Sequence, residues 1–194
     1  YYIGLASAGA TSYTGDGTSG LYVWAIQLEA ASTASSYIPT TGTSATRAAD
    51  VAYVDVATWL PALSMTNATF YAEFVAADSG NYGRILSTDQ VGISLLEIAS
   101  STQIASWDTS TNPKVSGGAV LNNSRKAALS ASAGSRTVAY AGATATGASN
   151  AYTAPTSIYI GRDVGGSYPF QGTIAVSRVY YGAQSAGQIA TLTT

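Results

Sequence analysis

The ten acidic residues are the first candidates for chemistry, because hydrolysis of a glycosidic bond needs two carboxyl groups about 5–10 Å apart. Two carboxylates on one face of a strand would be spaced at i and i+2 or i+4. Glu73 and Glu97 each stand alone in an expected strand, and Asp50 and Asp55 flank another at an odd spacing. This spacing argues against hydrolysis, and we expect that the chain is not an enzyme.

Histidine and cysteine are both absent from the 194 residues. Their absence excludes a Ser-His triad, a cysteine nucleophile, disulfides, and metal sites built on imidazole or thiolate. Calcium would need oxygen ligands, for which Asp78, Asp89 and Asp163 are the possible donors. No Asp-x-Asp loop groups them, so the favoured interpretation is that they stabilise turns and that no cofactor is bound.

The aromatic residues favour binding over catalysis. Fourteen tyrosines and three tryptophans stand against three phenylalanines, and Tyr and Trp combine an apolar ring with a polar end. Such rings can cover the C–H face of a sugar while Asn, Asp and Arg bind its hydroxyls. The candidate ligand-binding residues fall in or beside expected loops: Asn81, Tyr82, Arg84, Trp107, Asp108, Asn112, Tyr152, Arg162, Asp163 and Tyr168.

Structural roles remain open for the same residues. Trp107 can cover the core, and Tyr82 can be a turn residue. Arg162 and Asp163 can form a local ion pair that holds a loop. Four aromatic residues inside expected strands are predicted to lie in the core or at a subunit interface: Trp24, Tyr71, Tyr159 and Tyr180.

The composition restricts the partners. Charged residues make up only 9% of the chain, and the eight basic residues are scattered, so no nucleic-acid surface is expected. No apolar run reaches the length of a membrane span, so no membrane insertion is expected. A surface of Ser, Thr, Gly and Tyr suits burial against neighbouring subunits or contact with polar, uncharged ligands. The strand-like start at Tyr1 predicts a piece of a longer or processed protein.

Short alternating runs separated by Gly, Ser, Asn and Asp predict an all-β fold, a jelly-roll β-sandwich. The expected strands are 21–29, 51–54, 69–75, 84–87, 92–98, 103–107, 125–131, 136–140, 157–161 and 172–181. A tight hairpin is expected at 133–135, and Ser185 with Gln188 predicts a capped helical turn at the end. Residues 30–50 are poor in large apolar side chains and predict a connector. The predicted domains are therefore 1–48, with the terminal strands of another β domain, and 49–194, the sandwich.

Two stretches carry a resemblance to known families. The run 21–30 followed by Ser35-Ser36-Tyr37-Ile38-Pro39-Thr40 and Thr46-Arg47-Ala48-Ala49-Asp50 resembles a segment of phage tail-fibre and related virion proteins. In that family the segment ends a jelly roll like that of carbohydrate-binding modules. Residues 50–194 resemble concanavalin A-like, laminin-G-type sandwiches, on 125–129, 158–162, 172–174, 179–181 and the closing Ser185-x-x-Gln188-Ile189.

The resemblance implies a virion surface protein, a fibre, spike or decoration subunit, that attaches to glycans of the host surface. Only twenty residues precede the first motif, and its first run ends at Ala30, which leaves too few for a whole jelly roll. Assembly with other virion proteins as a homo-oligomer, with a trimer favoured as in phage fibres, would supply the missing partners. Two alternatives stay open: a purely structural capsid or tail cement subunit, and a secreted carbohydrate-binding module. The expected location is the virion surface or another extracellular site.

Overall fold

A computed structural model describes residues 15–18, 22–30, 36–46, 50–77, 82–108, 112–118, 120–150 and 154–194. The chain divides into two units, Tyr1–Arg47 and Ala48–Thr194. The division lies one residue before the boundary expected from composition. Each unit is described by itself.

The first unit contains no strand in its described residues, so the strand predicted over 21–29 is wrong for residues 22–29. A strand needs a hydrogen-bonded neighbour to be stable, and the described part of this unit offers none. The Trp24 side chain is 86% exposed, and its ring lies 5.8 Å from that of Tyr37. A side chain links the two segments instead, because the Ile38 amide donates to Gln27 Oε1 at 2.5 Å.

One of the two sheets of the second unit has six antiparallel strands in the order β1-β10-β3-β4-β5-β6. Its strands are β1 (Ala52–Asp55), β10 (Ser157–Ile160), β3 (Arg84–Thr88), β4 (Ile93–Ser100), β5 (Gln103–Asp108) and β6 (Lys114–Ser116). Register shifts interrupt the pairing of β3 with β4 and of β4 with β5. Such irregularities bend a sheet locally and redirect side chains.

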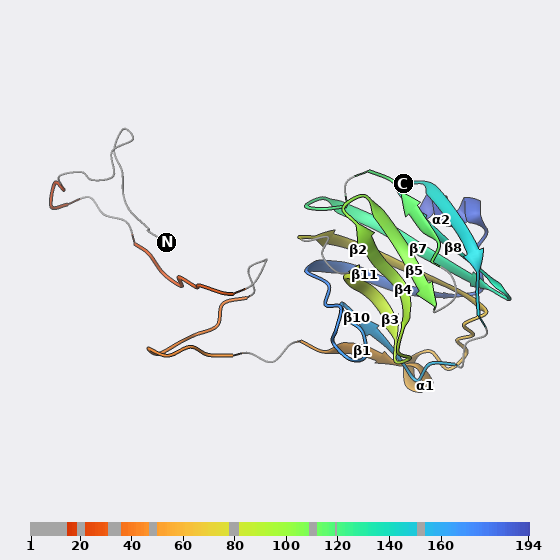
Figure 1. Ribbon diagram of the computed structural model, residues 1–194, viewed down its shortest axis with the longest axis horizontal. Helices are drawn as coiled ribbons and strands as arrows, with labels where there is room; N and C mark the ends of the chain where they lie inside the picture. Colours follow the sequence, from red (N-terminus) through yellow and green to blue (C-terminus); the bar gives the residue numbers. More distant parts are fainter. Residues whose placement is uncertain are drawn as a thin grey trace. The chain divides into compact units, whose positions relative to one another are not determined.

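A five-stranded antiparallel sheet has the order β11-β2-β7-β8-β9. Its strands are β11 (Gly172–Tyr181), β2 (Asn67–Ala76), β7 (Ser124–Ser132), β8 (Ser135–Tyr140) and β9 (Ala143–Ala148). The two sheets face each other, as Figure 1 shows, and enclose the main core. Phe70, Phe74 and Leu129 contribute to it from one sheet, and Ile85 and Ile104 from the other. The second unit is therefore a two-layer β-sandwich, as the alternating sequence pattern predicts.

Two short helices complete this unit. α1 (Val56–Trp59) follows β1, and Asp55 caps it by accepting a hydrogen bond from the Thr58 amide at 2.7 Å. α2 (Ala186–Leu192) lies beside β7 and β8 (Figure 1) and starts with the capping box predicted from Ser185 and Gln188. Ile189 of α2 is fully buried against the outer side of the five-stranded sheet. Neither helix of the described residues is long enough to cross a bilayer.

The sandwich contains every strand expected between residues 51 and 181, with ends that differ by a few residues. Two strands were not expected, namely β6 and β9. β6 has only three residues, and β9 reads Ala-Thr-Ala-Thr-Gly-Ala, which carries no large apolar side chain. Both form because a neighbouring strand offers hydrogen bonds, a condition that the local pattern does not record.

Candidate functional site

A row of side chains crosses the six-stranded sheet on its outer face. Arg84 is the register partner of Glu97, Glu97 of Ala105, and Ala105 of Lys114. Ile104, next to Ala105, packs in the core between the sheets. Because side chains alternate along a strand, Ala105 and its partners point away from the core. Charged groups from β3, β4 and β6 thus share one face.

Trp107 lies two residues after Ala105 on β5 and therefore projects from the same face. Here the surface forms a pocket with a volume of about 310 Å³, which we call the Arg84 pocket. That volume is at the lower end of the range for small-ligand sites, about 300–1,000 Å³. The residues that line the pocket are Tyr82, Arg84, Glu97, Trp107, Asn112 and Tyr168. Five of them are among the ligand-binding residues predicted from sequence, namely Tyr82, Arg84, Trp107, Asn112 and Tyr168.

Arg84 forms the floor of the pocket and is 5% exposed. Its guanidinium carbon lies 4.7 Å from the centre of the Tyr168 ring, within the range of a cation–π interaction. The backbone amide of Arg84 also donates to the Tyr168 carbonyl at 3.1 Å. The arginine and the tyrosine are thereby fixed relative to each other, although 84 positions separate them in sequence.

Two buried polar atoms at the pocket have no hydrogen-bond partner among the described residues, Arg84 Nε and Asn112 Oδ1. Buried polar groups are nearly always paired, so each such atom needs an explanation. One is a donor and the other an acceptor, and both belong to residues that line the same cavity. Both atoms are shielded from solvent, so the polar groups that a ligand can reach are the remaining ones of the lining residues.

Glu97 is 3% exposed, and its burial raises the pKa of its carboxyl group above the usual 4.5, against the opposing effect of nearby positive charges such as Arg84 and Lys114. A raised pKa means that the folded chain holds this proton more tightly than the unfolded chain does. The stability that the group contributes is complete below pH 4.5 and is lost as the pH rises through the raised pKa.

The Glu97→Gln variant should therefore gain stability relative to wild type as the pH rises from 4 toward 8, because the amide carries no charge to desolvate. Urea denaturation of both proteins across this pH series measures the difference in the free energy of unfolding. The same pH dependence in both proteins would contradict this assignment.

Asp108, also predicted as a ligand-binding residue, faces the interior. The alternation that turns Trp107 outward turns Asp108 inward. Its carboxylate forms a 2.7 Å ion pair with Arg136 of β8, in the opposite sheet, and both side chains are buried. Its other carboxylate oxygen accepts from the Asn150 amide at 3.0 Å, and Arg136 also donates to Ser106 Oγ at 3.1 Å. This arrangement ties the two sheets together behind the pocket.

Arg162 and Asp163 lie in the loop after β10 and are absent from the pocket lining. They form a local loop structure rather than a side-chain ion pair, because Arg162 Nε donates to the backbone carbonyl of Asp163 at 3.1 Å. The Asp163 carboxylate accepts from the Ser167 amide at 2.6 Å. In the same way Asp89 accepts from the amide and hydroxyl of Thr156. Asp163 thus stabilises its own turn, while Asp89 connects the loop after β3 to the start of β10.

Three predicted residues lie outside the described residues: Asn81, Tyr152 and the possible calcium ligand Asp78. Within the described stretches, no three acidic side chains lie close enough together to hold a metal ion.

Glu97 lines the pocket but is not among the binding residues predicted from sequence. Its carboxyl group suggested only catalysis, which the lack of a second carboxylate on the strand argues against. A signal was present, since Glu97 is the one charged residue in the strand Ile93–Ser100. Charged side chains are almost never fully buried without a partner, so an opposite charge on a neighbouring strand, here Arg84, could have been sought.

A scan of protein-family models finds no match to the chain, and a search of curated proteins finds none either. Solved structures do match. The CBM40 module of Ruminococcus gnavus IT-sialidase, bound to α2,3-sialyllactose, has a TM-score of 0.55 at 16% identity, over 66% of this chain and 83% of that one. A carbohydrate-binding protein of Bacteroides ovatus, described as putative, has a TM-score of 0.54 at 16% identity, over 72% and 43% of the two chains.

Domain 4 of AbnA, an extracellular arabinanase of Geobacillus stearothermophilus, in complex with arabinotriose, has a TM-score of 0.53 at 15% identity. The match covers 76% of this chain and 82% of that domain. Identities this low establish a shared fold and leave the ligand open. These structural matches and the two facing antiparallel sheets show that the second unit has a concanavalin A-like jelly-roll fold, as the matched carbohydrate-binding module does.

Proposed function

We propose that this chain is a non-enzymatic glycan-binding protein that holds a sugar residue in the Arg84 pocket. The observation that carries the proposal is the pocket itself, a cavity of about 310 Å³ whose lining combines the rings of Tyr82, Trp107 and Tyr168 with polar side chains. A sugar offers hydroxyls to the polar side chains and an apolar C–H face to the rings of Trp107 and Tyr82. The fold shared with carbohydrate-binding modules supports the same reading.

The rigid backbone around the pocket favours binding as well. Tyr82 has a left-handed backbone with φ of 56°, which orients its half-exposed ring at the rim. Such a conformation is uncommon for a residue other than glycine and persists only where the surroundings impose it. Gly83, the next residue, packs against the backbone of Pro169 and Phe170, directly after Tyr168. The contact of Gly83 with Pro169 and Phe170 thus holds the two tyrosines next to each other.

The Trp107→Ala variant should weaken glycan binding about 30-fold, because an aromatic anchor that a bound ligand covers contributes about 2 kcal/mol. The measurement is a glycan array that includes α2,3-sialyllactose, arabinotriose and bacterial surface polysaccharides, followed by calorimetry on whatever binds. Tyr82→Ala should act in the same direction.

Trp59 provides the matched control. It lies on α1, is 72% exposed and does not line the pocket, so Trp59→Ala should bind as wild type does. The proposal would be contradicted if the wild-type chain bound no glycan, or if the Trp59 and Trp107 variants lost equal amounts of glycan affinity.

The finer proposal is a virion surface protein, a fibre, spike or decoration subunit of a phage, that attaches to host glycans. It rests on the resemblance of residues 21–50 to tail-fibre proteins and on the low charge of the chain. The exposed apolar side chains of Tyr22, Trp24 and Leu28 favour assembly with other subunits, such as a homotrimer. Light scattering tests this assembly, and a monomeric mass would contradict it. Failure of glycan binding with a trimeric mass would favour a purely structural cement subunit.

A further inference from the structure

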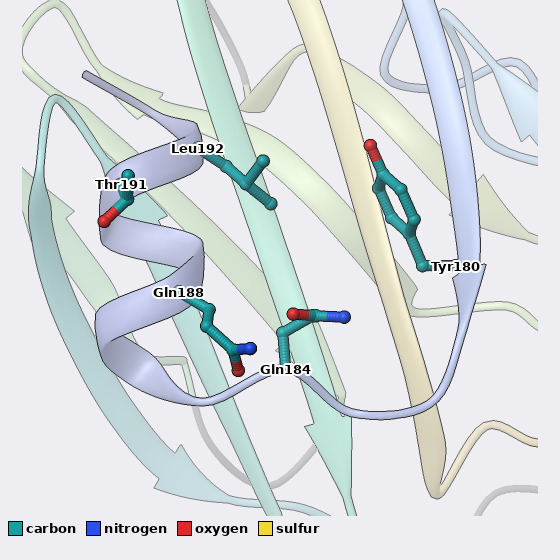
Figure 2. Close-up of a pocket in the computed structure, with 5 residues that line it drawn as sticks. All are labelled: Tyr180, Gln184, Gln188, Thr191 and Leu192. Atoms are coloured by element: carbon teal, nitrogen blue, oxygen red, sulfur yellow. The ribbon is translucent and has the colours of Figure 1, made fainter.

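A second groove lies on the outer face of the five-stranded sheet, and we call it the α2 groove. Tyr180 of β11 and Leu192 of α2 form its walls, and Gln184, Gln188 and Thr191 complete the lining (Figure 2). Its volume is about 330 Å³. Val179 packs against the core between the sheets, so its neighbour Tyr180 projects outward. The α2 groove and the Arg84 pocket therefore open on opposite faces of the sandwich.

The framework of the α2 groove is fixed by contacts on each side. Ile189 anchors α2 on the sheet against Ala128 and Ala139. The Gln184 amide donates to Thr69 Oγ1 at 3.0 Å, and the Gln184 carbonyl accepts from Ser130 Oγ at 2.6 Å. The backbone of Gln184 is thus held in place, and its side chain starts from a defined point at the base of the groove.

The carboxamides of the α2 groove have capacity for hydrogen bonds. The Gln184 carboxamide has no partner among the described residues, and it extends between the helix and Tyr180 in Figure 2. Gln188 Oε1 accepts from the Ser185 amide at 2.8 Å in the capping box, which leaves its amide hydrogens available. The groove therefore offers donors from both residues and an acceptor from Gln184.

The lining indicates the class of ligand. None of the five lining residues is charged, which disfavours an ionic ligand. The Tyr180 ring and the Leu192 side chain provide two apolar walls, while the carboxamides stand at the base. A neighbouring charge is that of Arg178, whose guanidinium lies over the Tyr71 ring at 5.8 Å and shares a hydrogen bond with the side chain of Tyr180. An uncharged sugar residue combines an apolar C–H face with hydroxyls and fits this arrangement.

We propose that the α2 groove is a second saccharide subsite, which takes an uncharged sugar residue on the face opposite the Arg84 pocket. This inference rests on the proposed glycan-binding function. Because the two sites face away from each other, one short oligosaccharide cannot occupy both. The sandwich then engages two glycan chains at once, which raises avidity on a surface where glycans are dense.

The test is a titration of the full chain, labelled with ¹⁵N, with neutral trisaccharides: arabinotriose, maltotriose, cellotriose and mannotriose. We expect shifts of amide signals in two separate groups, one at Arg84, Glu97 and Trp107, and one at Tyr180, Gln184 and Gln188. Gln184→Ala should weaken binding in the second group about tenfold, the effect of one lost hydrogen bond. Thr191→Trp should block the second group by filling the groove. Thr173→Trp, at an exposed position of the same strand β11, is the control and should leave both groups unchanged.

The outcomes separate the two proposals. If only the first group of signals shifts, the second subsite is wrong and glycan binding in the Arg84 pocket stands. If only the second group shifts, the subsite stands and the role of the Arg84 pocket is wrong. If Thr173→Trp abolishes the second group as Thr191→Trp does, the groove is not the site. If no signal moves with any of these neutral trisaccharides, the second subsite is overturned, and the glycan array decides the role of the Arg84 pocket.

Discussion

The Asp108→Ala variant should lose about 3–5 kcal/mol of folding stability, the usual cost of removing one partner of a buried ion pair. The substitution leaves the Arg136 guanidinium, which is 1% exposed, without its carboxylate inside the sandwich. It also removes the acceptor of the Asn150 amide. A loss of this size is a large part of the 5–15 kcal/mol that stabilises an ordinary domain. Urea denaturation followed by tryptophan fluorescence measures it.

Two further variants make the Asp108 result interpretable. Asp89 accepts hydrogen bonds from Thr156 near the surface, so Asp89→Ala should cost only about 1 kcal/mol. The double variant Asp108→Ala, Arg136→Met should recover much of the loss, because it removes the uncompensated charge as well. A single variant as stable as wild type would show that the pair does not connect the sheets.

The Phe74→Ala variant should lose about 3–5 kcal/mol of folding stability and weaken binding in the Arg84 pocket as well. Phe74 is 1% exposed in the core, and truncation of such a residue leaves a cavity. Its ring packs edge to face on Phe170 at 5.9 Å between ring centres. Phe170 lies two residues after Tyr168, which packs on Arg84. The cavity should therefore loosen the segment that forms one wall of the pocket.

Denaturation and glycan titration of the same Phe74→Ala sample test both effects. Tyr181 on the neighbouring strand β11 is 56% exposed, so Tyr181→Ala should change stability by no more than about 0.5 kcal/mol and leave binding intact. Unchanged glycan affinity in a destabilised Phe74→Ala protein would show that the pocket wall does not depend on this core contact.

The local pattern of the sequence was sufficient for the class and most elements of the sandwich. Short runs rich in apolar and aromatic residues, bounded by turn residues, identified strands such as β2 (Asn67–Ala76), most of whose residues are buried. The Ser185 and Gln188 pair identified the start of α2 for a similar reason, since capping involves only neighbours in sequence. The pattern failed at residues 22–29, where a strand also needs a partner that the described part of that unit lacks.

For the candidate site, the sequence determined which residue types could bind a sugar, and it named Tyr82, Arg84, Trp107 and Tyr168 before their proximity was known. Only the tertiary structure decided which of them meet. Arg84 and Tyr168 are brought together because a loop returns past the start of β3. The pairing of β3 with β4 places Glu97 beside them. The side chain of Asp108 points inward and connects the two sheets through its ion pair with Arg136. The register of strand pairing and the face from which each side chain projects depend on contacts between distant strands, which residue types alone do not specify.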